Sequence, residues 1–209
     1  MTDTGKTLIA VLLDRSGSMA AVRSDTEGGF DQFIRDQREK PCTAAVTLAQ
    51  FDNEYELVYS DVPVADVAPL KLVPRGMTAL YDGIGKLTTD IGAKLSATPE
   101  DERPGSVLVV VLTDGHENAS SEWTHDAVQA LIRQQQDQWK WTYLFLGATL
   151  DAVQTGVSMG IARANSMHYS TNSTRETFDV LSRAATNVRG AGAFTGFSDA
   201  DRKAAAGGE

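Results

Sequence analysis

The feature that most constrains this chain is an unbroken apolar run at residues 8–13, which stops at Asp14-Arg15-Ser16-Gly17-Ser18. An apolar run without alternation is typical of a central parallel strand that is covered on both faces. The polar segment places one carboxylate and two hydroxyls at alternate positions, so all three oxygens can turn inward on one tight loop. Hard divalent cations such as Mg²⁺ or Mn²⁺ bind oxygen donors of this kind. The sequence therefore predicts a buried strand that ends in a candidate cation-binding loop.

Apolar runs of strand length alternate with segments of helical periodicity along the chain. Strands are predicted at 7–13, 42–51, 55–62, 106–112, 142–146 and 167–170, and helices at 19–39, 79–95, 124–139, 150–159 and 174–188. The turn Asp52-Asn53-Glu54 predicts that the second and third strands form a hairpin. This alternation indicates an α/β fold with a mostly parallel sheet wrapped on both sides. We expect one domain over residues 1–189 and, because Gly, Ala and charged residues dominate the rest, a flexible tail at 190–209.

The two most apolar predicted strands both end in aspartate. Asp14 follows the first, and Asp114 follows the strand at 106–112 within Thr113-Asp114-Gly115. Ligands of open α/β sheets bind beyond the carboxyl ends of the strands, where the strand order reverses. If these two strands are neighbours there, both carboxylates meet in one crevice. Thr78, just before the predicted helix 79–95, adds a hydroxyl from a third segment.

These residues together resemble the metal-ion-dependent adhesion site (MIDAS) of the von Willebrand factor type A (vWA) domain, in residue type and in order. The set consists of Asp14, Ser16, Ser18, Thr78 and Asp114. The resemblance implies a three-layer, doubly wound sheet with one antiparallel edge strand. It also implies that the two serines ligate the ion directly, the threonine directly or through water, and the two aspartates mostly through water. The implied cofactor is Mg²⁺, with Mn²⁺ or Ca²⁺ as alternatives. A nearly neutral ligand set leaves the ion electron-poor, so a partner's carboxylate becomes a favoured further ligand.

Each of these residues also has a purely structural interpretation. Asp14 and Asp114 could cap helices or tighten turns, and Ser16, Ser18 and Thr78 could each be a helix N-cap. The joint occurrence of all five on one strand–helix frame favours the metal site. Next to it, His116 and Glu117 are expected to be solvated loop residues rather than part of a partner-binding surface.

Composition limits the possible partners. A net charge of −9 argues against nucleic acid as a partner, since a phosphate backbone needs a basic face. A single cysteine, Cys42, excludes an internal disulfide and favours a reducing compartment. We find no signal peptide and no apolar run of about 20 residues that could span a membrane. These observations predict a cytoplasmic protein with no membrane partner.

The resulting hypothesis is a non-enzymatic binding module that captures an acidic side chain of another protein through the cation. We expect a stand-alone adaptor or a subunit of a complex, with an ATPase or an assembly-complex subunit as a candidate partner. One alternative is a scaffold subunit whose metal site is unused. Another is a metal-dependent phosphatase-like enzyme with Asp14 as nucleophile, but such enzymes need a second acid two residues on, where this chain has Ser16.

Overall fold

The computed structural model describes residues 1–208, which form a six-stranded sheet between two layers of helices. The strands are β1 (Asp3–Asp14), β2 (Thr43–Phe51), β3 (Tyr55–Pro63), β4 (Pro104–Thr113), β5 (Thr142–Gly147) and β6 (Ser166–His168). Their order across the sheet is β3-β2-β1-β4-β5-β6. Every neighbouring pair is parallel except β2 and β3, which are antiparallel. The predicted doubly wound sheet with one antiparallel edge strand is therefore confirmed.

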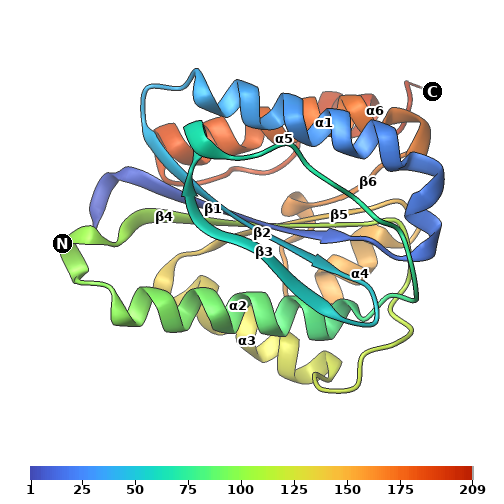
Figure 1. Ribbon diagram of the computed structural model, residues 1–209, viewed down its shortest axis with the longest axis horizontal. Helices are drawn as coiled ribbons and strands as arrows, with labels where there is room; N and C mark the ends of the chain where they lie inside the picture. The colour runs from blue at the N-terminus through green and yellow to red at the C-terminus, as the bar shows by residue number, and fades with distance from the viewer. Residues whose placement is uncertain (209) are drawn as a thin grey trace.

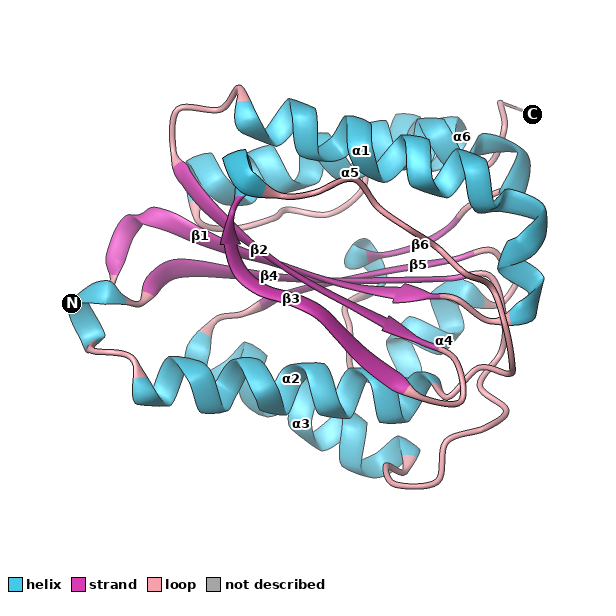
Figure 2. Ribbon diagram, viewed as in Figure 1, coloured by secondary structure: helices cyan, strands magenta, loops and turns pink. Residues whose placement is uncertain are grey.

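Helices cover both faces of the sheet. They are α1 (Arg23–Arg38), α2 (Leu80–Ala97), α3 (His125–Trp139), α4 (Ala152–Ser158), α5 (Thr174–Ala191) and α6 (Asp199–Ala205). Figure 1 shows α1, α5 and α6 on one side of the strands and α2, α3 and α4 on the other. Figure 2, coloured by element type, shows the same three layers. No helix within residues 1–208 is long and apolar enough to cross a membrane.

The apolar run at residues 8–13 forms the centre of β1 and contributes side chains to the cores on both faces of the sheet. Ile9, Val11 and Leu13 pack into the core beneath α1 and α5. Leu8, Ala10 and Leu12 face the core beneath α2 and α3. Alternation of side chains along a strand sends successive residues to opposite faces, so a strand buried on both faces must be apolar at every position.

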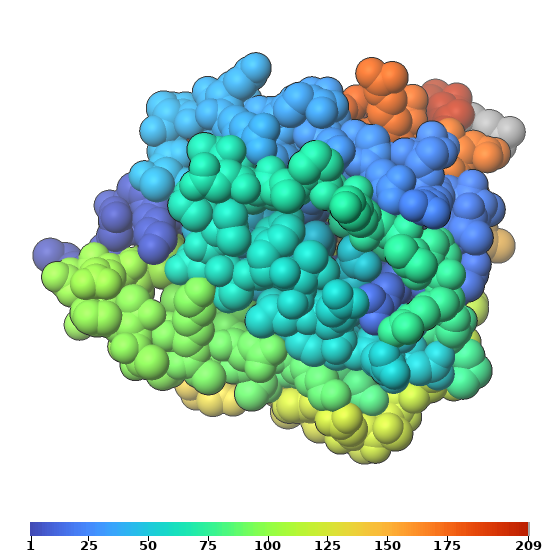
Figure 3. Space-filling model, viewed as in Figure 1, coloured from blue at the N-terminus to red at the C-terminus, as the bar shows by residue number. Residues whose placement is uncertain are grey.

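The hairpin places β3 at one edge of the sheet. In the space-filling view of Figure 3 this strand lies at the surface, between the two helical layers. Its side chains are mostly exposed or half-buried, whereas those of β2 are buried from Ala44 onward. The β2–β3 register shifts twice, and Asp61 adopts a positive φ of 58°. β3 is therefore an irregular edge strand.

The region between β1 and α1 differs in detail from the prediction of one helix over 19–39. A short 3₁₀ helix spans Gly17–Val22, and the α-helix begins only at Arg23. The α-helix therefore starts four residues later than predicted, after the loop that carries the candidate ligands and the short 3₁₀ helix.

Up to residue 208, the segment expected to be a flexible tail contains helical residues. Helix α5 continues to Ala191, and α6 follows at Asp199–Ala205. Phe197 and Ala205 are buried in the core beneath α1 and α5. The Ser198 hydroxyl and the Asp201 carboxylate form a reciprocal capping box at the start of α6. Apolar burial and a well-formed cap explain why this Gly- and Ala-rich segment is ordered here.

Candidate metal site

The strand order brings the two predicted carboxylates together. β1 and β4 are neighbours in the middle of the sheet, and the chain runs from them in opposite directions, so their carboxyl ends form the switch point. Asp14 is the last residue of β1, and Asp114 directly follows the last residue of β4. The condition for the two carboxylates to meet, that their strands are neighbours, is therefore fulfilled.

Hydrogen bonds link the two aspartates through the two serines. The Ser18 hydroxyl donates to Asp114 Oδ1 at 2.6 Å, and the Ser16 and Ser18 Oγ atoms lie 3.1 Å apart. Asp14 accepts the Ser16 backbone N–H at 2.6 Å and the Thr113 hydroxyl at 2.6 Å, one on each carboxylate oxygen. Asp14 and Ser16 are buried, while Ser18 is exposed. Four predicted ligand side chains therefore form one continuous polar cluster that opens to solvent on one side.

Thr78 reaches the same cluster from a third loop. A Cβ atom placed on Gly115 would lie 3.2 Å from Thr78 Oγ1, 3.9 Å from Ser18 Oγ and 4.0 Å from Asp14 Oδ2. The three oxygens therefore lie within 4.0 Å of one point beside Gly115, where a glycine has no side-chain atom. Asn118 holds the backbone of the threonine, because its Oδ1 accepts the Thr78 N–H at 2.8 Å and its own N–H donates to Thr78 O at 3.0 Å.

The helix-capping alternative fails for two of the candidate residues. Ser16 precedes the 3₁₀ helix, but its side chain makes no capping hydrogen bond there. Helix α2 has Ala79 rather than Thr78 at its N-cap position. The turn-tightening interpretation of Asp14 is correct in part, since its bond to the Ser16 N–H closes the start of the loop.

The cluster has too little positive charge for its two carboxylates. Burial raises the pKa of Asp14 to about 6, and the nearby charge of Asp114 also raises it. Hydrogen bonds from Thr113 and Ser16 lower this pKa but do not outweigh burial. Burial also raises the pKa of Asp114, although the hydrogen bond from Ser18 opposes it. Arg15 does not compensate, because its guanidinium pairs with Asp52 instead. A cation bound at this position would supply the missing charge.

The donor set fits a hard divalent cation. Octahedral coordination at about 2.1 Å places adjacent ligand oxygens about 3.0 Å apart. The Oγ atoms of Ser16 and Ser18 are separated by 3.1 Å, close to that value. Within residues 1–208 no group of three or more His, Cys, Asp or Glu side chains could hold a metal, so a site here must draw on hydroxyls. Hydroxyl-rich oxygen sets suit Mg²⁺, Mn²⁺ or Ca²⁺ rather than metals that prefer thiolate or imidazole. Metal binding by these residues stays a prediction.

Glu117 is not the solvated loop residue that the sequence suggested. Its Oε1 accepts the N–H groups of Ala119 and Ser120 at 2.9 and 2.7 Å, and its Oε2 accepts the N–H of Tyr81 at 3.0 Å. Glu117 therefore connects the loop after β4 to the first turn of α2. A carboxylate is stabilised there by the partial positive charge of the helix N-terminus. His116, by contrast, is exposed, with Nδ1 3.8 Å from a carboxylate oxygen of Asp151.

Asp82 makes a second connection between the same two segments. Its carboxylate accepts the backbone N–H groups of Ser121, Glu122 and Trp123 at 2.7 to 3.0 Å. Sequence reasoning missed this role, since a carboxylate inside a helix carries no signal of a partner about forty residues away.

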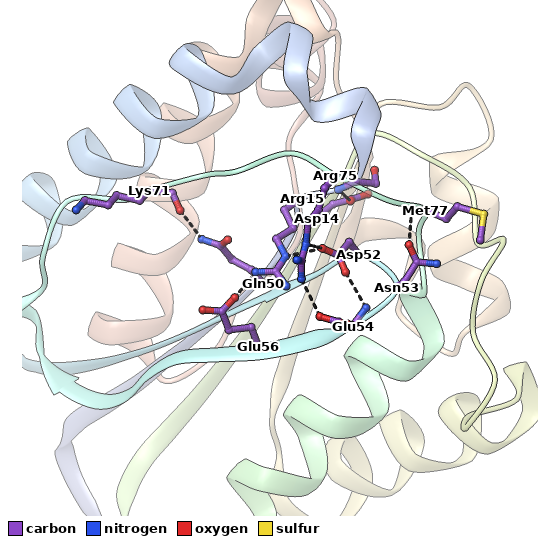
Figure 4. A network of polar contacts seen from close by, with 11 residues as sticks. Asp14, Arg15, Gln50, Asp52, Asn53, Glu54, Glu56, Lys71, Arg75 and Met77 are labelled. Carbon is purple, nitrogen blue, oxygen red and sulfur yellow. Dashed lines mark hydrogen bonds and ion pairs between the residues drawn. The ribbon is translucent and has the colours of Figure 1, made fainter.

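A cluster of ion pairs behind the first loop was also missed. Arg15, between two candidate ligands, is buried and bonds Asp52 and Glu56, while Arg75 bonds Asp52 and Glu54 (Figure 4). The run of charge at Asp52-Asn53-Glu54 predicted only a turn, because its partners come from distant segments.

The sheet order, the two helical layers and the oxygen cluster at the switch point define an α/β domain with the vWA fold. No protein-family model and no curated protein sequence matches the chain. Several solved structures, however, are similar to it in fold. Proximal thread matrix protein 1 (PTMP1) from the mussel byssus superposes with a TM-score of 0.61 and 16% identity over 89% of this chain. A second PTMP1 structure, described as having a zinc-occupied MIDAS motif, gives a TM-score of 0.61 with 17% identity over 87% of this chain.

Microbial structures show the same similarity. A vWA protein from Catenulispora acidiphila has a TM-score of 0.58 and 13% identity over 87% of the chain. The ArnB paralog VWA2 from Sulfolobus acidocaldarius has a TM-score of 0.54 and 16% identity over 86%. The chain spans 46% to 48% of the length of the PTMP1 structures, 43% of the Catenulispora protein and 45% of VWA2. At these identities the similarity establishes the fold of this chain.

Proposed function

We propose that this chain is a protein-binding module that captures an acidic side chain of a partner protein through a divalent cation. The cation would be held by Asp14, Ser16, Ser18, Thr78 and Asp114. The observation that carries the proposal is the convergence of polar side chains from three loops at the carboxyl ends of β1 and β4, three of the five bearing hydroxyls.

The chemistry of recognition follows from the hydroxyl-rich set. Ser16, Ser18 and Thr78 would provide neutral oxygens to the ion, and Asp14 and Asp114 would orient water around it. Since the oxygens in direct contact with the ion would be neutral, an incoming carboxylate would be the first anionic ligand to touch it and so gains a strong electrostatic contact. Ser18 is exposed, so the cluster is accessible to a side chain of another protein. We take Mg²⁺ as the resident ion, with Mn²⁺ and Ca²⁺ as alternatives. We take a subunit of an ATPase or of another assembly as the kind of partner, inside the cytoplasm.

The enzyme alternative gains little from the geometry. A nucleophilic carboxylate needs a free oxygen that faces the substrate. Asp14 is fully buried, and each of its oxygens already accepts a hydrogen bond. The residue two positions later is Ser16, which cannot act as a general acid at neutral pH. These observations support a binding role without a chemical step.

The test has two stages. First, isothermal titration with Mn²⁺ compares wild type with D14A and with D137A, an exposed aspartate of α3 that serves as the matched control. Binding by wild type and D137A but not by D14A supports the site. Second, immobilised protein captures partners from the lysate of the native host in Mg²⁺ or in EDTA. A protein that is retained only in Mg²⁺, and only by wild type and D137A, supports metal-mediated recognition. Capture that ignores both EDTA and D14A would favour the scaffold interpretation.

A further inference from the structure

The loop that carries the two candidate serine ligands lies directly against the loop that leads to Thr78. The Gly17 N–H donates to Gly76 O at 3.2 Å, and the Arg75 N–H donates to Arg15 O at 2.8 Å. The relative position of these two loops therefore decides whether the hydroxyls from each can reach the same ion.

Asp52, the residue directly after β2, accepts hydrogen bonds from both loops on one carboxylate oxygen. Its Oδ2 accepts Arg15 Nε at 2.8 Å and Arg75 Nε at 2.7 Å, while its Oδ1 accepts the Glu54 N–H at 2.7 Å. Figure 4 shows the two guanidinium groups reaching this carboxylate from different segments. The aspartate is 1% exposed and the Arg15 side chain is also buried, so water cannot readily replace the contact between these two residues. None of its hydrogen bonds goes to a candidate ligand.

The backbone of the same turn holds the start of α2. The Asp52 carbonyl accepts the Ala79 N–H at 2.8 Å, and Asn53 Oδ1 accepts the Met77 N–H at 2.8 Å. Gly76 has a φ of +67°, and a Cβ there would lie 2.3 Å from Asn53 Oδ1, so no other residue fits this approach without strain. The hairpin turn and the Thr78 loop thus interlock.

We propose that Asp52 is a positioning residue for the metal site, which fixes the serine loop and the Thr78 loop in the relative position that a cation needs. The inference rests on the proposed function, because the consequence it names is a change in metal affinity. Groups that hydrogen-bond a metal ligand directly typically change metal affinity 10- to 100-fold when they are substituted. Asp52 acts one step further out, through the two loops, so we expect an effect at or below the lower end of that range.

The perturbation is D52N, which keeps the shape of the side chain and removes the charge that attracts both arginines. A second variant, R75Q, guards against misfolding, since Arg75 is 54% exposed and its loss leaves the buried Arg15–Asp52 pair intact. Matched controls are D201N and R183Q. Arg183 is 58% exposed and donates to Asp201 at 2.7 Å, but this pair joins α5 to α6 rather than the two loops.

Two measurements are made on each protein. Titration calorimetry with Mn²⁺ gives the affinity, and amide hydrogen exchange of the ion-free protein reports on Gly17 and Arg75, whose N–H groups join the loops. The affinity measurement is repeated in a T78A background. A residue that acts by placing Thr78 loses part of its effect when the threonine hydroxyl is gone, whereas an unrelated destabilisation does not.

We expect D52N to weaken Mn²⁺ binding by up to about tenfold and R75Q to weaken it less. Both should lower the protection of the amides of residues 17 and 75 against exchange, after correction for the intrinsic rate of the new side chain at position 75. The D52N effect should shrink in the T78A background, and D201N and R183Q should bind as wild type does. Wild-type affinity and unchanged exchange in folded D52N would overturn the inference while leaving the proposed function in place. Absence of Mn²⁺ binding by wild type would overturn both.

Discussion

Gly115 offers a direct test of the space in which the ion would lie. A methyl group at this position would lie 3.2 Å from Thr78 Oγ1, a few tenths of an ångström closer than an ordinary contact. The backbone of Gly115 does not adopt a positive φ, so alanine is compatible with its conformation. Displacing a ligand oxygen by a few tenths of an ångström exceeds the tolerance of about 0.2 Å for metal–ligand distances. G115A should therefore impair cation binding while the protein stays folded.

The magnitude follows from linkage between binding and folding. At an ion concentration ten times the dissociation constant, binding stabilises the wild type by about 1.4 kcal/mol. For a chain of this size, each kcal/mol shifts Tm by about 2–4 °C, which gives a rise of about 3–6 °C. If G115A weakens binding about tenfold, the stabilisation falls to about 0.4 kcal/mol and the rise to about 1–2 °C.

The assay is thermal unfolding with and without Mn²⁺. The control is G92A, since a methyl group at Gly92 in α2 would meet no atom within 4 Å. G92A should keep the full response to the ion and gain up to about 1 kcal/mol of stability from helix propensity. A full wild-type shift in G115A would refute the placement of the ion beside Thr78.

Three further outcomes are expected from the structure. Adjacent glycines of α1 should respond in opposite ways in thermal unfolding: G28A has open space and should gain up to about 1 kcal/mol, whereas G29A would place a methyl group 2.3 Å from the Phe178 ring and should lose about 1–3 kcal/mol. Equal Tm changes in the two variants would contradict this packing of α1 on α5. D82A removes the acceptor of three backbone N–H groups and should lower the free energy of unfolding in urea by about 2 kcal/mol. Proteolysis of residues 119–124 should become faster. Unchanged stability would mean that other contacts hold this loop. Burial raises the pKa of Asp52, but hydrogen bonds from Arg75 and the Glu54 N–H, together with the charge of Arg15, lower it below its usual value of 3.8 overall. This carboxylate therefore contributes stability above about pH 4 that is lost as the pH falls through its pKa in the folded protein, and D52N should flatten the acid limb of the stability curve. An unchanged acid limb would exclude that contribution.

Much of the fold could be read from local patterns because its central strands are buried on both faces. The apolar run of β1 needs no knowledge of its partners to be recognised. The meeting of Asp14 and Asp114 was also predictable, since parallel strands put their carboxyl ends at one edge and ligands gather where the strand order reverses.

Contacts between distant segments were beyond the reach of the sequence. Arg15 binds a carboxylate 37 positions later, and Glu117 binds the N–H of Tyr81. Neither pair has a periodicity or a fixed spacing from which it could be inferred.

The C-terminal helix is a different case, because the sequence did contain a signal. Ser198 and Asp201 have the spacing of a capping box, and Phe197 precedes them as an apolar anchor. Composition outweighed that signal in the prediction of a tail.

The irregular edge at β3 has a consequence for how such a molecule can associate. A strand of another molecule can pair with a sheet edge only where the edge presents backbone N–H and C=O groups at regular intervals. The register shifts between β2 and β3, the positive φ of Asp61 and Pro63 at the strand end interrupt that row. Extension of the sheet by a second copy is therefore disfavoured, and with it the growth of fibrils from this side. Copies of the chain at high concentration should therefore not pair along β3.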